Sequence, residues 1–446
     1  MNSVFVPCIF HVDSIYFFNA DSNMIRTHTF KAAQPKSLLD DCNRESGRIY
    51  TQTMVEHWRV YNKKGVWLRP RTNQSYDDFL HPDTTLHAHS RDAAQEAFPK
   101  ACKTTRSLRK AGFSQARFPY HRKFFRTTTW KNTGIGVKGT VALLARARGL
   151  EPVRVELPED IAQLEFVEAR LVYNKRSSHY EWHFVADDGV EPTVRTEGCM
   201  VAVDMGEIHP AACTNGTDAL VISCRELRST GQGLAKTIAR LEAKKARCKR
   251  GSIRYRRLCK AKAKARTKKE YKQRDMLHKV SRAVVDYAVE SDAQEIVIGD
   301  VRDIADGVDI GKKSNQKISL WPHGKLRTYI EYKALAEGIA TTLQEESYTS
   351  QTCPNCGERH KPHGRIYKCS GCGWRGHRDG QVGAPNILSK HTTGECGRVL
   401  IPNPPKYRHP FLTGKRSCAD TRLLGKPDVA FSSSQHGNVL KEAMPL

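Results

Sequence analysis

The sequence predicts a mixed α/β domain that contains an inserted zinc ribbon and follows a small antiparallel β-barrel with a helical insert. Residues 200–206 and 295–301 are largely apolar runs that each contain an aspartate at or near their end. A stretch of sequence with a helical pattern separates them. Such runs are typical of buried neighbouring strands, and a tight turn at 205–206 followed by strand 211–214 fits an RNase H-like sheet. Strand-like alternation at 153–157, 165–173 and 180–185 predicts the barrel.

Four cysteines give the strongest local signal in the chain. Cys353 and Cys356 form one CxxC pair, Cys369 and Cys372 form a second, and a glycine follows each pair. A polar, basic connector separates them. This spacing is that of a tetrahedral four-thiolate zinc site, so the four side chains are predicted to bind structural Zn²⁺.

The composition predicts a polyanionic partner. The chain has 446 residues and a formal net charge of +26, with 73 Lys and Arg against 47 Asp and Glu. Phosphate backbones are the usual partner of such a surface. No apolar run is long enough to cross a bilayer, and the first residues lack the features of a signal peptide, so the sequence predicts an intracellular protein without membrane association. The cysteines outside the ribbon are then expected to be reduced thiols.

Two basic segments are candidates for contact with nucleic acid. Residues 117–126 interleave aromatic side chains with Arg117, Arg122, Lys123 and Arg126. Cations meet phosphates while aromatic faces accept unstacked bases, but a half-buried strand with a solvated basic face explains the same pattern equally well.

The second basic segment is a helix expected at 235–274, which is dense in cations and nearly free of acids. Solvated helices normally carry both signs, so this segment is predicted to lie against phosphates. The cations chosen as candidates are Lys244, Lys245, Arg247, Lys249, Arg250, Arg254, Arg256 and Arg257.

Other stretches complete the expected order of elements. A strand or hairpin is predicted at 1–20, and helices at 36–58, 90–110, 278–289 and 335–343. From residue 392 to 446 the sequence is rich in Pro, Ser and Gly and predicts an irregular tail.

The sequence resembles the transposon-encoded TnpB family and its relatives, the miniature type V CRISPR effectors, which are RNA-guided DNA nucleases with a RuvC domain. The residues that carry the resemblance are 201–206, the segment 348–357 that leads into the ribbon, and His377-Arg378-Asp379 with Gly383-Ala384 and Asn386-Ile387-Leu388. It is specific over about 201–388.

The resemblance implies three catalytic carboxylates that bind divalent metal, expected to be Mg²⁺, and two of them match directly as Asp204 and Asp379. The family's second motif usually has Glu where this chain has Gly299. Some relatives share that glycine and carry a compensating Glu upstream of the Tyr-Thr-Ser segment, here Glu346. Asp300 is the fallback ligand. The third motif holds one extra residue between Asp379 and Asn386.

Family architecture implies how the chain is divided. A wedge-like barrel is expected at 1–20 and 134–195, a helical recognition insert at 21–133, a RuvC-like nuclease part at 196–346 and the zinc ribbon at 347–376. The third RuvC motif follows at 377–391 and the tail at 392–446.

The implied function is RNA-guided DNA endonuclease, with guide RNA and target double-stranded DNA as partners in the cytoplasm, near the nucleoid, of a prokaryote, as a monomer or dimer. A nuclease-dead, RNA-guided DNA binder that represses or recruits is the alternative, and Gly299 favours it. A guide-free transposase is a third candidate, and copurifying RNA would exclude it.

Overall fold

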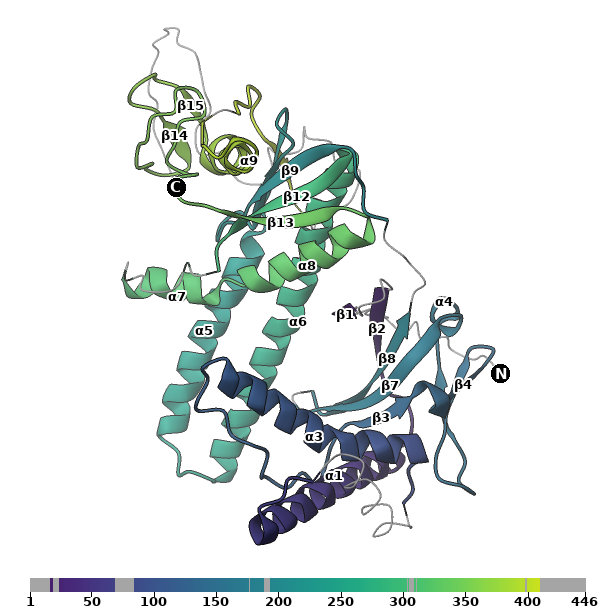
Figure 1. The fold of residues 1–446 in the computed structure, drawn as a ribbon. Helices are drawn as coiled ribbons and strands as arrows, with labels where there is room; N and C mark the ends of the chain where they lie inside the picture. Colours follow the sequence, from purple (N-terminus) through teal and green to yellow (C-terminus); the bar gives the residue numbers. More distant parts are fainter. Residues whose placement is uncertain are drawn as a thin grey trace, which may run out of the picture. The chain divides into compact units, whose positions relative to one another are not determined.

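A computed structural model gives the fold of the chain (Figure 1). It describes residues 17–18, 24–68, 84–175, 177–187, 193–302, 304, 309, 311–397 and 399–409. The described residues divide into two compact units. The first comprises the described parts of 1–196, 230–273 and 331–340, and the second those of 197–229, 274–330 and 341–446. Most of the hairpin expected at 1–20 lies outside the described residues, and so does the tail beyond residue 409.

The first unit contains two antiparallel sheets. One has five strands in the order β1-β2-β8-β7-β3, and the other has three in the order β4-β5-β6. Their bounds are Phe17–Phe18 (β1), Met24–Lys31 (β2), Thr128–Lys131 (β3), Ile135–Lys138 (β4), Val141–Leu144 (β5), Val153–Glu156 (β6), Glu165–Asn174 (β7) and His179–Asp187 (β8). The strands expected at 153–157, 165–173 and 180–185 are confirmed as β6, β7 and β8.

One hydrophobic core joins these two sheets. Trp130, Leu144, Leu171 and Trp182 are buried in it, because their alternating positions place them on the inner faces of the strands. The closed barrel expected from the sequence is not confirmed, since the described strands pair into two separate sheets.

Two long helices pack together beside the five-stranded sheet, α1 (Lys36–Lys64) and α3 (Ala88–Lys110). They confirm the helices expected at 36–58 and 90–110. The boundaries expected for the helical insert were too wide, because β2 and β3 lie inside residues 21–133 and belong to the sheet. Residues 132–134 and α4 (Glu159–Ala162) are short helical turns.

The basic segment is a helical hairpin and not the single helix that the composition predicted. Helix α5 (Arg225–Ala246) and helix α6 (Ile253–Glu290) are joined by residues 247–252, where Gly251 has a φ of 86°. A left-handed backbone favours glycine and ends helical hydrogen bonding. Near this turn the helices contact each other, since Glu242 of α5 pairs with Lys262 of α6. The helix expected at 278–289 is the C-terminal part of α6.

The second unit is built on a six-stranded mixed sheet in the order β13-β12-β9-β10-β11-β16. Strands β9 (Cys199–Asp204) and β12 (Ala293–Asp300) are parallel, whereas β10 (Ala211–Thr214) is antiparallel to both β9 and β11 (Ala219–Ile222). This arrangement confirms the two neighbouring buried strands and the returning strand at 211–214. Helix α9 (Ala384–Thr393) packs on β9, β10 and β12, with Ile387 and Leu388 against Ala202 and Val297.

The helix expected at 335–343 was wrong. Helix α8 (His323–Ala336) ends within the first two residues of that segment, and Ala340–Glu345 is strand β13. A short apolar run does not distinguish a helix from a strand by its pattern, and here the open edge of β12 decides the outcome. Helix α7 (Lys312–Leu320) precedes α8.

The zinc ribbon and the start of the tail complete this unit. The ribbon contains the antiparallel pair β14 (Ile366–Lys368) and β15 (Arg375–His377). The tail is not irregular throughout, because β16 (Lys406–Arg408) pairs in parallel with β11. Within the described residues, every helix is too short or too polar to cross a membrane.

Candidate metal centres

Asp204 stands at the end of a buried strand. Val201, Ala202 and Val203 are fully buried in β9, and this strand pairs with β12 on one side and β10 on the other. The backbone that carries Asp379 passes close to its carboxylate, since a Cβ atom at Gly383 would lie 2.1 Å from Oδ2 of Asp204. Glycine is therefore needed at 383 for this close approach.

Glu346 lies where a side chain at position 299 would lie. A Cβ atom at Gly299 would be 1.7 Å from Oε1 of Glu346 and 2.6 Å from its Cδ. Gly299 is in β12, next to β9, and Glu346 directly follows β13. The carboxylate of Glu346 therefore fills the space left by the glycine, as the resemblance implied.

The electrostatics of these two carboxylates favour a bound cation. Burial raises the pKa of Asp204 well above its usual value, and the nearby carboxylates of Glu346 and Asp379 raise it further. Burial also raises the pKa of Glu346 to about 7. Among the described residues, Oε1 of Glu346 is buried without a hydrogen-bond partner. Buried oxygens of this kind are destabilising unless a cation or a proton compensates them.

The two neighbouring acids are engaged elsewhere. Glu345 is exposed, pairs with Lys390 and accepts a hydrogen bond from the backbone N of Ser347 at 2.7 Å, so it faces away from Glu346 as an extended chain requires. Asp300, the fallback ligand, pairs with Arg302, whose Nη2 lies 2.5 Å from Oδ2. The hydrogen bond from Arg302 lowers the pKa of Asp300.

Asp379 lies in a π-helical turn, Arg378–Gly383, that leads directly into α9. A π-helical hydrogen bond joins residues five apart instead of four, so such a turn accommodates one extra residue within a helical segment. This turn covers most of the stretch between Asp379 and Asn386, where the resemblance implies one extra residue. Pro385 is the second residue of α9, where its missing N–H and fixed φ are tolerated.

Two arginines hold the Asp379 carboxylate. Nη1 of Arg365 lies 2.5 Å from Oδ2, and Nε of Arg378 lies 3.2 Å from Oδ1. Burial acts to raise the pKa of Asp379, but Arg365 and Arg378 outweigh burial and keep the pKa below its usual value. Arg365 comes from the ribbon and was missed by the sequence analysis, since no local pattern distinguishes it from other basic residues of the connector.

The carboxylates of Asp204, Glu346 and Asp379 are neighbours, but their oxygens do not converge on one point. Within the described parts of the chain, the oxygens of Asp204, Glu346 and Asp379 do not all lie within 4.8 Å of one another, whereas donor atoms of His209, His377 and Asp379 do. Like charges repel, and the arginines hold Asp379 on their side. His209 was also missed; burial lowers its pKa to about 4, so its imidazole is neutral near pH 7. His377 Nδ1 accepts a hydrogen bond from Gly380 N at 3.1 Å.

Asn386 ties the Glu346 segment to α9. This buried side chain donates to the carbonyls of Thr349 at 2.7 Å and Thr352 at 2.8 Å, and accepts from Gly397 N at 2.8 Å. Thr349 in turn bonds through its N and Oγ1 to the carbonyl of Glu346. The Tyr-Thr-Ser segment and the asparagine of the third motif thus act as one clamp that positions two of the acids.

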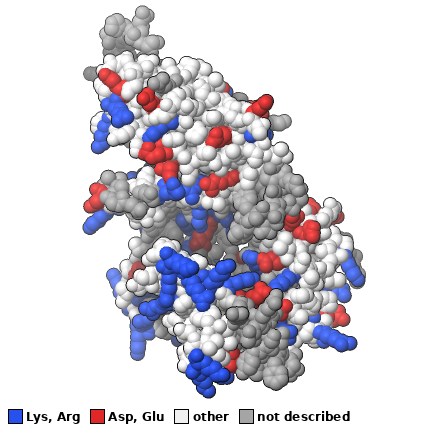
Figure 2. Space-filling model, viewed as in Figure 1, with Lys and Arg blue, Asp and Glu red and all other residues white. Residues whose placement is uncertain are grey.

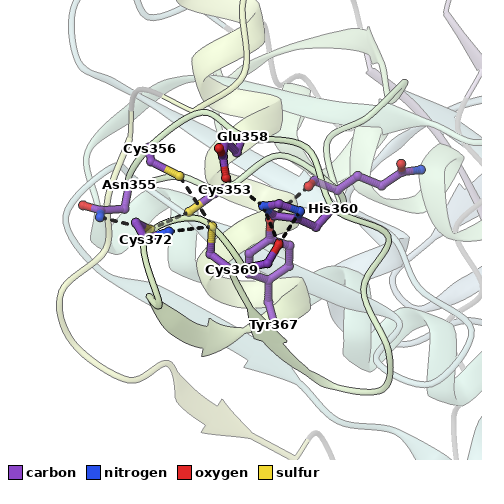
Figure 3. Close-up of polar contacts among 10 residues, drawn as sticks. Cys353, Asn355, Cys356, Glu358, His360, Tyr367, Cys369 and Cys372 are labelled. Atoms are coloured by element: carbon purple, nitrogen blue, oxygen red, sulfur yellow. Dashed lines mark hydrogen bonds and ion pairs between the residues drawn. The ribbon is translucent and has the colours of Figure 1, made fainter.

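The four ribbon cysteines converge on one point (Figure 3). Their Sγ atoms all lie within 4.8 Å of one another, with 3.7 Å between Cys353 and Cys372 and 3.5 Å between Cys356 and Cys369. Zinc–sulfur bonds of about 2.3 Å in a tetrahedron require sulfur atoms about 3.8 Å apart, so the cluster fits Zn²⁺. Tyr367 is buried beneath it and donates from its hydroxyl to the carbonyl of Gln351 at 3.0 Å.

We expect Cys369→Ser to release the metal and to destabilise the ribbon together with the Arg365–Asp379 contact. A three-thiolate site loses most of the binding free energy that folds such a module. Metal analysis of the purified protein and protease protection at 351–378 measure this. The exposed, non-ligand Cys259→Ser is the control, and zinc-free wild-type protein with a folded ribbon would contradict the assignment.

The cationic candidates differ in their surroundings. Seven of the eight in the hairpin are exposed, whereas Lys245 is half-buried and pairs with Glu242. Figure 2 shows Lys and Arg gathered in the part of the view where α3, α5 and α6 are drawn. Arg117, Arg122 and Lys123 are exposed as well. Arg126 is not: its guanidinium lies 4.2 Å from the ring centroid of Tyr50, and burial lowers its pKa.

Comparison with known proteins agrees with these features. The Cas12f1-like TNB domain matches residues 323–387, and the OrfB_IS605 family, described as a probable transposase, matches residues 182–305. The chain is similar to the TnpB-like protein MJ0751 of Methanocaldococcus jannaschii, with 32% identity over 121 residues, which are 27% of this chain and 43% of that protein. The resemblance to TnpB is confirmed.

A second relative and a solved structure extend this result. The CRISPR-associated endodeoxyribonuclease Cas12f1 of Sulfoacidibacillus thermotolerans is 32% identical over 117 residues, 25% of this chain and 26% of that protein. The matched segments thus span less than half of either relative. A structure of a Cas12f1–sgRNA–target DNA complex superposes with a TM-score of 0.50 at 13% identity, covering 75% of this chain and 80% of that one, which supports a shared fold.

Proposed function

We propose that this protein is an RNA-guided DNA endonuclease whose RuvC-like site is formed by Asp204, Glu346 and Asp379. The observation that carries the proposal is the position of Glu346, whose buried, unpartnered oxygen fills the space above Gly299 beside Asp204. The likeness to TnpB and Cas12f1 supplies the reaction class. Guide RNA paired with target DNA would supply the sequence specificity, next to a short motif that the protein reads.

The donor set fits Mg²⁺. Carboxylate oxygens are the ligands that Mg²⁺ prefers, and the raised pKa values of Asp204 and Glu346 mark a site in need of positive charge. When bound, magnesium would activate water and stabilise the leaving oxygen in phosphodiester hydrolysis. Asp204 and Glu346 would hold the cation from the sheet, and Asp379 from the π-helical turn.

Arg365 and Arg378 would neutralise negative charge at the site. Arg365 and Arg378 neutralise Asp379 in this structure, and their guanidinium groups would be free for another anion if Asp379 were to hold a cation. A planar guanidinium suits a phosphodiester because it donates two parallel hydrogen bonds. Both side chains would then contact the phosphate of the cleaved strand.

We also propose that the two units have different roles. The sheets and helices of the first unit, with α1 and α3 as the helical insert, would recognise guide and target, and the second unit would cleave. The α5–α6 hairpin would bind RNA phosphates through its exposed cations.

Reversing four hairpin cations tests this last point. We expect the combined change of Arg247, Lys249, Arg250 and Arg254 to Glu to weaken RNA binding and to lower the slope of log K against log salt by about 3 to 4. Filter binding at several salt concentrations measures it. Reversal of Lys312, Lys325, Lys361 and Lys368, which are exposed cations of the second unit, changes the net charge equally and should leave most of the slope intact. Equal effects of the two sets would mean that the hairpin is an ordinary solvated surface.

The proposed function is tested by sequencing the RNA that copurifies with the protein and then incubating the complex with a plasmid library that carries the matching target. Cleavage in magnesium that Asp204→Ala abolishes would support the proposal. Purified protein that carries no RNA and still cuts DNA would instead indicate a guide-free transposase.

The alternative is a nuclease-dead, RNA-guided DNA binder. Gly299 favours it, because the usual acid of the second motif is missing there. Guided binding without any nicking in magnesium or manganese would establish this alternative.

A further inference from the structure

The segment 116–127 has no regular secondary structure, yet its backbone is fixed to the two long helices of the first unit along most of its length. Three bonds attach its first part. Arg109 Nε donates to the carbonyl of Ala116 at 2.7 Å, Thr105 Oγ1 to that of Arg117 at 3.4 Å, and Trp58 Nε1 to that of Pro119 at 2.9 Å.

The second part is fixed to α1. Thr51 Oγ1 accepts from the N of Lys123 at 2.9 Å and donates to its carbonyl at 3.1 Å. Arg126 N donates to the carbonyl of Asn43 at 2.9 Å. Gly47 lets the segment cross α1 in contact, because a Cβ atom there would lie 2.5 Å from the backbone N of Phe125.

Two aromatic side chains of the segment pack against the rest of the first unit and anchor it there. Phe118 packs with Trp58 and Trp67, and Phe125 packs with Tyr173 and Tyr180. Both ends of the segment are therefore held by partly buried rings that pack against the hydrophobic cores, as well as by hydrogen bonds.

Of the six side chains between these anchors, Pro119 is half-buried and the other five are exposed: Tyr120, His121, Arg122, Lys123 and Phe124. Tyr120 is 55% and Phe124 69% exposed, which is unusual for aromatic side chains on a fixed backbone. Arg122 and Lys123 form no ion pair with any described residue. A fixed backbone thus presents two aromatic rings with an imidazole and two free cations between them.

We propose that residues 120–124 form a binding site for unpaired nucleotides, in which Tyr120 and Phe124 stack on bases while Arg122 and Lys123 meet the phosphates. This inference rests on the proposed function and assigns to it a second contact with nucleic acid, separate from the cationic hairpin. Ring faces bind bases whose own faces are open, which duplex bases are not. The hairpin, by contrast, offers cations and few exposed rings, as a contact with phosphates requires.

The fixed backbone adds to the affinity. An ordered loop has already lost the conformational entropy that a flexible loop would lose on binding. Arg126 does not belong to the site, since it is occupied with Tyr50. This resolves the two interpretations of the basic aromatic segment: its two ends are structural, and its middle is a binding surface.

The test measures the binding of a short single strand to the full-length Asp204→Ala protein, so that cleavage does not interfere. One base of the strand is replaced by the fluorescent analogue 2-aminopurine, whose emission falls on stacking. We expect Tyr120→Ala and Phe124→Ala each to weaken binding by about 5- to 150-fold and to restore the emission. Arg122→Gln and Lys123→Gln should instead lower the salt dependence and leave the quenching in place.

Two controls make the result specific. A strand with abasic positions should bind wild-type protein more weakly but should lose nothing further on Tyr120→Ala or Phe124→Ala. Phe113→Ala removes a comparably exposed ring, 63% accessible, outside the five residues and should have little effect. Strands of RNA and DNA with the same sequence separate guide from melted target as the source of the nucleotides.

The outcomes separate this site from the function on which it rests. Unchanged binding and quenching in Tyr120→Ala and Phe124→Ala, or equal losses in Phe113→Ala, would overturn the site even if guided cleavage is intact. Loss of binding in these variants of a protein that never cleaves a guided target would keep the site and exclude the nuclease.

Discussion

The substitution Glu346→Ala is expected to reduce guided cleavage by about a thousandfold or more while leaving guide and target binding intact. A carboxylate that holds a catalytic cation contributes several kcal/mol of transition-state stabilisation, and each 1.36 kcal/mol is about tenfold in rate. Asp204→Ala and Asp379→Ala should have the same effect, because removing one ligand of a shared metal site disables the whole site. Single-turnover cleavage of a guided plasmid, with gel-shift binding in parallel, measures both quantities.

Two neighbouring acids are the matched controls. Glu345→Ala should be mild, since Glu345 is exposed and pairs with Lys390. Asp300→Ala should be intermediate at most, because Asp300 is bound to Arg302. If Glu346→Ala cleaved normally and Asp300→Ala were inactive, Asp300 would be the third ligand and Glu346 would have no role in the site.

The parts of the fold that the sequence predicted are those with a strong local pattern. Strands β9 and β12 contain the apolar runs 200–203 and 296–298, as central strands buried on both faces require. The ribbon follows from the chemistry of zinc, which fixes the spacing of its ligands. The position of Glu346 came from the resemblance, and the geometry at Gly299 supplies its physical reason.

The parts that were missed depend on contacts between distant segments. Strand β13 forms because β12 offers an open edge, and β16 forms because β11 does, although both are short and weakly patterned. The break between α5 and α6 covers residues 247–252 and includes a left-handed residue, Gly251, and the sequence around it has no other strong signal that ends a helix. Arg365 reaches Asp379 because the antiparallel pair β14–β15 brings residues 365 and 378 together, where Arg378 N bonds to the carbonyl of Arg365 at 2.9 Å.

Substitution of Gly299 is expected to have the second largest effect on cleavage, because this glycine leaves the space that Glu346 fills. We expect Gly299→Ala to reduce cleavage by about a hundredfold, since the added methyl group displaces the carboxylate and a 1 Å misplacement at a catalytic site has effects of this size. The atoms in conflict are the flexible end of a side chain, so the thermal unfolding midpoint should change little. Gly233→Ala, where the added methyl group meets nothing within 4 Å, is the control for the glycine change itself.

Moving the acidic side chain from position 346 to position 299 tests the same geometry by restoring activity instead of removing it. In the inactive Glu346→Ala protein, Gly299→Glu restores an acidic side chain to the vacated space from β12, and we expect cleavage to recover by about tenfold or more. Gly299→Gln in the same background has the same shape without the charge and should recover nothing, because the site requires an anion to hold the cation. Equal recovery with glutamine would mean that residue 346 acts through packing, and no recovery with either would mean that the carboxylate must come from the segment after β13.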